Sequence, residues 1–212
     1  KVLVFDTETT GLPQNNPSIY QTHLWPHVVQ LSYMLYDTDK NKIIASDDYL
    51  IKIPKDVEIS QESIDVHGIT RRKVDNHGYK MEQILQIFQV CLDECDFIVA
   101  HNLQFDKNML MVEGVRHNIK LGFDTPQSYC TMKNGKKICK IEQVNSYGEI
   151  YFKYPKLIEL HKTLFNSEPN SLHNAFVDIL VCMRCFYKLI YNDDLCVKNI
   201  HFNKQIKKYR SE

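Results

Sequence analysis

Apolar runs along the chain predict strands, and apolar residues at 3.6-residue spacing predict helices. Residues 1–5 end in the apolar run VLVF, which is typical of a buried strand. Early strands joined by short turns, then strands alternating with helices, indicate an α/β fold with a mixed central β-sheet flanked by helices. The other predicted elements are strands at 28–37, 42–53 and 97–100, a helix at 80–95, and mostly helices thereafter.

Two predicted helices have a clear apolar face. The helix at 80–95 presents a core face of Met81, Ile84, Leu85, Phe88, Cys91, Leu92 and Cys95. A later helix has an apolar stripe of Phe176, Ile179, Leu180, Met183, Phe186, Tyr187 and Ile190. Asp178 lies off this stripe, and Asn170 or Ser171 is expected to cap the helix.

Two carboxylates follow the first predicted strand. Residues i and i+2 of a strand share a face, so Asp6 and Glu8 are expected side by side. Like charges at that distance are tolerated if they are solvated, protonated or neutralised by a divalent cation. Oxygen ligands without cysteine suit Mg²⁺ or Mn²⁺ better than Zn²⁺. The alternative is that Asp6 only begins a turn.

Two later segments also carry candidate chemistry. Asp106 falls early in a predicted helix after the 97–100 strand, where a carboxylate can instead be a surface residue that interacts with the helix dipole. Residues five apart do not share a helix face, so His173 must come from the loop or first turn to reach Asp178. Alone, His173 would be a solvated or capping residue. Together, four carboxylates and one histidine predict a two-metal phosphodiesterase site.

Three motifs stand in a characteristic order: FDTETTG at 5–11, HNLQFD at 101–106 and HNAFVD at 173–178. With them the chain resembles the DEDD exonuclease superfamily, in the histidine branch (DEDDh) that includes the epsilon proofreading subunit of bacterial DNA polymerase III. The tyrosine branch has a tyrosine where this chain has Asn174. The segment HGIT at 67–70 is similar to a substrate-side loop of epsilon-like members.

This resemblance implies a ribonuclease H-like fold and a specific reaction. The protein would hydrolyse terminal phosphodiesters of DNA in the 3′–5′ direction, preferably at single-stranded or frayed 3′ ends, releasing nucleoside 5′-monophosphates. Two divalent cations would be held by Asp6, Glu8, Asp106 and Asp178, with Asp6 as the bridging ligand. His173 would be the general base, since its ordinary pKa is near 6.5. Contacts to the terminal nucleotide are implied for Thr9, Leu12, His67, Asn102 and Phe105.

Three other functions remain open from the sequence. A 3′–5′ exoribonuclease has the same metal ligands, because discrimination rests on 2′-hydroxyl contacts that no motif reveals. A catalytically silent nucleic-acid-binding module would have lost one of the five residues, and all five are present. A ribonuclease H-type endonuclease would not need the H-x-x-x-x-D arrangement. The sequence also does not show whether a polymerase or another replication protein is a partner.

Composition adds limits and two basic clusters. The 212 residues are 43% hydrophobic and fit one exonuclease domain at 1–191, with a basic C-terminal extension at 192–212. The 26 basic and 26 acidic residues balance, so any nucleic-acid contact must come from local charge. Such clusters are Lys133, Lys136, Lys137 and Lys140, and then Lys198, Lys204, Lys207, Lys208 and Arg210, with Phe202 and Tyr209 for base stacking. Solvated surface is the alternative interpretation.

Cysteine usage and hydropathy favour an intracellular protein. Seven cysteines, several in apolar helical segments, indicate reduced thiols in the cytoplasm or nucleus. The pair Cys182 and Cys185 has no second pair at zinc-finger spacing. No apolar run approaches a membrane span, so no membrane partner is expected. Residues 12–27 and 133–154 are insertions, and the turn signals Asn134-Gly135 and Tyr147-Gly148 predict an extra hairpin in the second.

Overall fold

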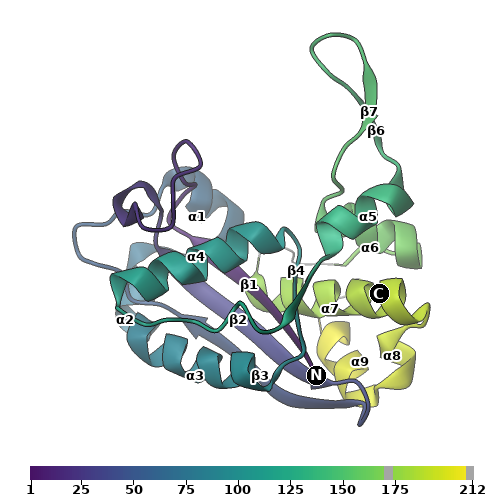
Figure 1. Ribbon diagram of the computed structural model, residues 1–212, viewed down its shortest axis with the longest axis horizontal. Coiled ribbons are helices and arrows are strands. Elements are labelled where there is room, and N and C mark those ends of the chain that lie inside the picture. Colours follow the sequence, from purple (N-terminus) through teal and green to yellow (C-terminus); the bar gives the residue numbers. More distant parts are fainter. Residues whose placement is uncertain (170–173, 209–212) are drawn as a thin grey trace.

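A five-stranded mixed sheet forms the centre of the computed structural model, which describes residues 1–169 and 174–208 (Figure 1). The strand order is β3-β2-β1-β4-β5; β2 runs antiparallel to β1 and β3, whereas β4 is parallel to both β1 and β5. The strands are β1 (Val2–Thr9), β2 (Val28–Asp37), β3 (Lys42–Leu50), β4 (Phe97–Ala100) and β5 (Gln127–Cys130). The predicted α/β fold with a mixed sheet is confirmed.

Helices cover both faces of this sheet (Figure 1). One face carries α3 (Met81–Glu94) and α4 (Leu103–Arg116). The opposite face carries α7 (Ala175–Tyr191), α8 (Leu195–Lys198) and α9 (Ile200–Lys207). The remaining helical segments are η1 (Thr22–Leu24), α1 (Gln61–His67), α2 (Arg71–His77), α5 (Thr131–Cys139) and α6 (Leu157–Phe165).

Strand β1 determines which face receives the acidic residues. Its side chains alternate: Leu3 and Phe5 pack under α3 and α4, whereas Val2 and Val4 pack under α7. Asp6 and Glu8 continue the α7 face. The sequence placed the strand end at residue 5, and this was wrong, because β2 pairs with β1 beyond that point and opposes Ser32 to Asp6 and Gln30 to Glu8. The predicted end of β3 at residue 53 was also too late, since the strand ends at Leu50.

Helix α7 is buried on two sides. The predicted apolar stripe packs on the sheet through residues such as Ile179 and Met183. Val177 and Val181 pack on the opposite side against Leu160 of α6. This second apolar side was not predicted. It is covered by helices of the 133–154 insertion and of the segment that follows it, and the sequence pattern did not show that they pack on α7. The cap is Asn174, whose side chain accepts hydrogen bonds from the N–H groups of Phe176 and Val177; the predicted caps, Asn170 and Ser171, lie outside the described residues.

Part of the C-terminal extension belongs to the core. Phe202 and Ile206 of α9 are buried together with Leu195 and Cys196, against the α7 side of the sheet. The prediction that Phe202 is available for base stacking is therefore wrong: hydrophobic burial fixes this ring inside the protein. Tyr209 lies outside the described residues.

The insertion at 133–154 contains the predicted hairpin, formed by β6 (Glu142–Val144) and β7 (Ile150–Phe152) and turning at Tyr147-Gly148. The predicted turn at Asn134-Gly135 is wrong, because both residues lie inside α5. Gly135 serves close packing there: an added Cβ would approach the Leu160 side chain to 2.9 Å. All seven cysteines are free thiols within the described chain. No helix among the described residues has the length and hydropathy of a membrane span.

Candidate active site

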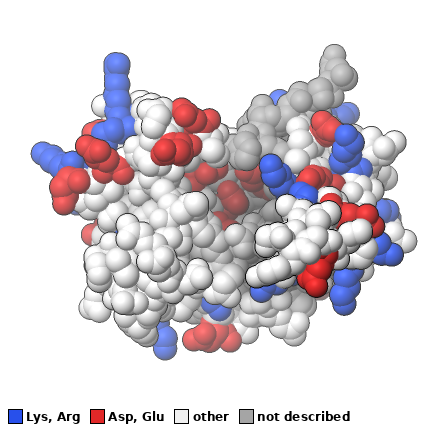
Figure 2. Space-filling view, turned by 90° about the horizontal axis from the view of Figure 1, so that it is seen from above, with Lys and Arg blue, Asp and Glu red and all other residues white. Residues whose placement is uncertain are grey.

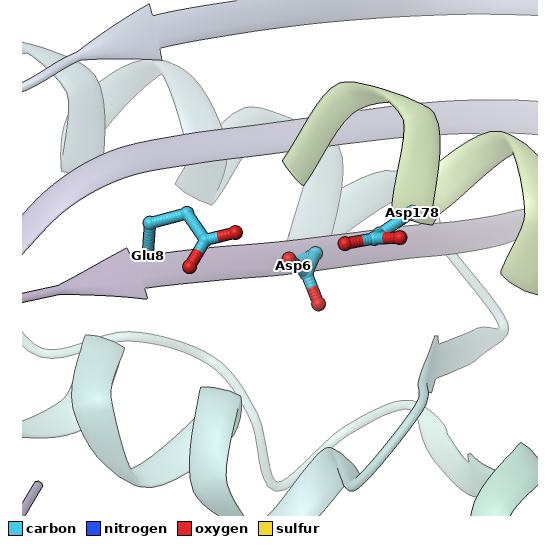
Figure 3. A group of neighbouring side chains, drawn as sticks. All are labelled: Asp6, Glu8 and Asp178. Carbon is cyan, nitrogen blue, oxygen red and sulfur yellow. The ribbon is translucent and has the colours of Figure 1, made fainter. Parts of the chain in front are cut away.

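Three carboxylates converge on the α7 face of the sheet. Asp6 and Glu8 come from β1, and Asp178 comes from the first turn of α7, which crosses that strand (Figure 3). All three side chains are half-buried, and each offers a carboxylate oxygen within 4.8 Å of one offered by the other two. The two-residue period of the strand brings Asp6 and Glu8 together, and packing of α7 on the sheet adds the third.

Asp106 joins this group from α4 and is held there by Thr7. Its side chain is only 3% exposed. One carboxylate oxygen, Oδ1, accepts hydrogen bonds from the Thr7 backbone N–H at 3.0 Å and from the Thr7 hydroxyl at 2.8 Å. Thr7 lies between Asp6 and Glu8 and faces the α4 side of the sheet, so it fastens the fourth carboxylate to the same strand. Thr7 was not among the predicted site residues; its position between two acids in DTE was the one local signal, and it does not indicate the partner.

The four carboxylates raise one another's proton affinity. Burial, and then the charges of Asp106, Asp178 and Glu8, hold the pKa of Asp6 well above its usual range. Burial, and then Asp178 and Asp106, raise the pKa of Glu8 to about 8. Burial raises the pKa of Asp106 to about 7, and the Thr7 hydrogen bonds oppose that rise. The site therefore needs protons or cations to offset its negative charge.

This donor set fits divalent metal ions. Asp6, Glu8 and Asp178 present three hard oxygen ligands within one ion's reach, and the buried Asp106 carboxylate stands nearby in the same electrostatic group. Oxygen donors of this kind suit Mg²⁺ and Mn²⁺. The only metal-ligating group found among the described residues is this one, and it contains neither cysteine nor histidine.

The match to a protein family agrees with this geometry. The family model for exonucleases, RNase_T, matches residues 3–186 of the 212-residue chain. The chain belongs to this exonuclease family. The match spans the elements that supply Asp6, Glu8, Asp106 and Asp178, and it confirms the predicted DEDD superfamily. The histidine branch and the likeness to epsilon stay predictions. No curated protein sequence matches the chain.

Two solved exonucleases share the fold of this family member. E. coli exonuclease I in complex with a dT13 oligonucleotide superposes with a TM-score of 0.66 at 15% identity, covering 88% of this chain and 40% of that chain. Exonuclease X in complex with 5′ overhanging duplex DNA gives a TM-score of 0.57 at 19% identity, covering 91% of this chain and 93% of that one. This chain thus spans less than half of exonuclease I. At these identities the likeness establishes the ribonuclease H-like fold.

The residues implied as nucleotide contacts fall into two groups. Leu12 is 80% exposed just beyond β1, and Asn102 is exposed at the start of α4 with a left-handed backbone, φ +77°. Phe105 packs partly against the core beneath α4. Leu12 and Asn102 are therefore exposed to solvent, whereas Phe105 has a packing role.

The side chains of Thr9 and His67 form hydrogen bonds with backbone groups of the protein. The Thr9 hydroxyl donates to the Gly11 carbonyl at 2.7 Å. His67 Nδ1 accepts from the Ile69 N–H at 3.0 Å, so its Nε2 carries the proton and donates to the Thr9 carbonyl at 3.1 Å. Burial lowers the pKa of His67, which favours this neutral form. These bonds tie the α1 end to the β1 end, and they occupy the groups expected to face the nucleotide. His173, the proposed base, lies outside the described residues.

A cavity of about 810 Å³ lies at the far end of α4 and shares no residue with the carboxylates of the site. Its wall includes Glu113, which accepts a hydrogen bond from the Val28 N–H and pairs with Arg116 at 2.7 Å. Arg116 in turn donates to the carbonyls of Thr22, Trp25 and Pro26. These bonds fasten the 12–27 loop to α4, so they have a structural role.

Replacing Thr7 by Val tests how Asp106 is held. Valine keeps the shape of threonine but removes the hydroxyl hydrogen bond. Loss of a partner behind a metal ligand typically weakens metal binding or activity about 10- to 100-fold. We expect the Mg²⁺ concentration for half-maximal activity to rise by that factor, and Thr7→Ser to retain near-normal behaviour. Equal Mg²⁺ dependence for Thr7→Val and the wild-type protein would contradict the positioning role.

Divalent cations are expected to stabilise the protein more at alkaline pH. Between their ordinary and raised pKa values, Glu8 and Asp106 bind more protons in the native than in the unfolded state, so the free energy of unfolding falls as pH rises toward about 8. Mg²⁺ replaces the lost protons. At about 100 times its Kd it should raise Tm by about 5–10 °C. Thermal melts with Mg²⁺ or EDTA at pH 6.5 and 8.5 measure this. An equal Mg²⁺ effect at both pH values would contradict it.

Proposed function

We propose that this protein is a metal-dependent 3′–5′ exonuclease that acts on single-stranded or frayed 3′ ends of DNA and releases nucleoside 5′-monophosphates. The observation that carries the proposal is the convergence of Asp6, Glu8 and Asp178, with Asp106 bonded to Thr7 beside them. Membership of the exonuclease family supports the reaction class. The two structural relatives were solved with DNA, which favours DNA over RNA as substrate.

The site residues would have three roles: binding cations, positioning a carboxylate and accepting a proton. Asp6, Glu8 and Asp178 would hold one divalent cation, and Asp106 would hold a second that shares Asp6. Bound cations supply Lewis acidity and offset the charge that builds on the scissile phosphate. Thr7 orients Asp106 for this task. His173 would accept a proton from the attacking water, as a group with an ordinary pKa near 6.5 does at neutral pH.

The surface around the site supports a substrate with a free single-stranded end. Leu12 is exposed just beyond β1 and can lie against a terminal base, and Asn102 is exposed at the start of α4. A frayed nucleotide reaches carboxylates in a hollow more easily than a paired one does, because its base is already unstacked. A polymerase partner, as implied by the likeness to epsilon, belongs to the same proposal.

The test is digestion of end-labelled DNA and RNA of one sequence, with free or blocked 3′ ends, in Mg²⁺ or Mn²⁺. Stepwise shortening of DNA from free 3′ ends, absent with blocked ends, is the expected result. Preferential shortening of RNA would overturn the choice of polymer in favour of an exoribonuclease. Cleavage of blocked ends would indicate an endonuclease, and no metal-dependent cleavage of either polymer would leave a binding module.

A further inference from the structure

The β6–β7 hairpin and its flanks, residues 141–154, form an arm that stands away from the rest of the protein (Figure 1). Its two strands pair only with each other among the described strands, with Glu142 opposite Phe152 and Val144 opposite Ile150. An isolated two-stranded hairpin is marginally stable in water. Contact with another molecule would add stability to the arm.

The arm exposes large apolar side chains. Val144 and Ile150 oppose each other, and Phe152 lies two residues further along β7, so the three share one face, on which Glu142 stands opposite Phe152. Their exposed fractions are 61%, 67% and 40%. Tyr151 and Tyr154 are also exposed, and Tyr147 at the tip is 88% exposed. Contiguous exposed apolar surface of this kind is typical of a binding site.

The tip of the arm is braced by hydrogen bonds. Asn145 Oδ1 accepts from the N–H groups of Tyr147 and Glu149, each at 2.9 Å. The Gly148 N–H donates to the Asn145 carbonyl at 3.0 Å, and Gly148 has φ +83°, which favours glycine. The turn therefore holds Tyr147 outward on a defined backbone, as a stacking platform requires.

The base of the arm is bonded to the elements that carry the active site. His101, at the end of β4 and just before α4, contacts the Pro155 carbonyl through Nε2 at 3.0 Å and the Thr131 hydroxyl through Nδ1 at 2.9 Å. The Thr131 hydroxyl lies 3.5 Å from the Cys182 sulfur, one α7 turn after Asp178. Viewed from the side on which the arm rises, the protein shows acidic side chains in a central hollow (Figure 2).

Lysines gather at the base of the arm, whereas the arm itself carries Glu142, Glu149 and Lys153. Lys133, Lys137 and Lys140 are exposed on α5 and its C-terminal cap, which lead directly into the arm. The Lys136 ammonium lies 4.8 Å from the centre of the Tyr154 ring. Aromatic side chains beside lysines are the combination that binds single-stranded nucleic acid, through base stacking and phosphate contacts. A protein partner bound through apolar contacts alone would not contact these lysines, whereas a nucleic acid would bind them through its phosphates.

We propose that the arm binds the single-stranded part of the nucleic-acid substrate upstream of its 3′-terminal nucleotide. Bases stack on Tyr147 and on the face formed by Val144, Ile150 and Phe152, and phosphates contact the α5 lysines. The arm lies on the same side as the acidic hollow, so one strand can occupy both. This inference rests on the proposed function and extends it, because it assigns a second contact region outside the catalytic carboxylates.

A fluorescent reporter tests direct contact. Tyr147→Trp, made in the Asp6→Asn background so that the probe survives, places an indole at the tip, while the chain's only other tryptophan, Trp25, is buried. Adding a thymidine oligonucleotide of about 15 nucleotides should quench the new indole by stacking. Tyr191→Trp on the exposed end of α7 is the matched control and should not respond. Quenching of neither variant, or of both equally, would overturn the proposal.

Affinity measurements with the same oligonucleotide test the energetic contribution. We expect Tyr147→Ala to weaken binding about tenfold, the loss expected for one stacked base. Changing Lys133, Lys137 and Lys140 to Gln should reduce the slope of log affinity against log salt by about 2, since each single-strand phosphate contact contributes about 0.7. Tyr191→Ala and Lys42→Gln, at exposed positions elsewhere, are the controls.

These experiments distinguish failure of the arm proposal from failure of the proposed exonuclease function. If the wild-type protein digests oligonucleotides but the arm variants bind and digest as it does, the arm inference fails and the exonuclease stands. If nothing is digested, the proposed function fails, while the quenching assay in the Asp6→Asn background still reports on the arm. If the arm variants lose only self-association in sedimentation and keep their oligonucleotide affinity, the arm is a contact between copies of the chain, and the proposal is overturned.

Discussion

Asp6→Asn is expected to slow DNA digestion at least about a thousandfold and yet to raise the Tm of the metal-free protein. The rate falls because Asp6 is central to the site: it offers a carboxylate oxygen within 4.8 Å of those of Glu8 and Asp178, and burial, followed by the charges of Asp106, Asp178 and Glu8, raises its pKa. Metal ions contribute several kcal/mol to stabilisation of the transition state, which corresponds to such a factor. The Tm rises because asparagine removes a buried charge that the fold disfavours.

Steady-state rates in Mg²⁺ and thermal melts in EDTA at pH 8 measure the two effects on one preparation. Asp124→Asn, at an exposed position away from the site, is the matched control and should change neither. A wild-type rate for Asp6→Asn would remove this residue from the reaction. A lower Tm in EDTA would show that Asp6 supports the fold, and the rate would then say nothing about catalysis.

The sheet could be predicted where burial alone determines the strand. All ten residues of β2 are buried, and its bounds at 28–37 agree with the apolar pattern. The end of β1 was misplaced because Asp6 and Glu8 look like turn residues, and only pairing with β2 extends the strand through them. Strand β5 was missed, since QSYC at the sheet edge has little apolar character and is defined by its pairing with β4.

The candidate site could be predicted to a similar extent. The i, i+2 spacing of Asp6 and Glu8 is a local property, and the motif order indicated that Asp106 and Asp178 belong with them. Which groups already have partners is a tertiary property. The hydrogen bond from His67 to the Thr9 carbonyl spans 58 positions of the chain. The Thr7 bond to Asp106 crosses 99, and no local pattern reveals it.

His173→Ala is expected to lower turnover by about 10² to 10⁴ without weakening oligonucleotide binding. The reason is chemical. The metal-ligating group among the described residues consists of carboxylates alone, and each of them is needed as an anion. A separate proton acceptor with a pKa near neutrality would leave these carboxylates free to bind the cations, and imidazole is the side chain that provides one. A general base removes a proton from the attacking water, so its loss lowers the rate. A histidine that only bound DNA would instead change the affinity for the oligonucleotide.

Single-turnover rates and oligonucleotide affinities, both measured across pH, separate these roles. The wild-type rate should rise with pH through the titration of the base, and the variant should lose that limb and regain part of its rate when free imidazole is added. His201→Ala, at an exposed position on α9, should behave as the wild-type protein does. If the variant keeps the wild-type rate, or if added imidazole has no effect and only binding is lost, His173 is a substrate contact. The carboxylates and their cations would then have to generate the nucleophile without a protein base.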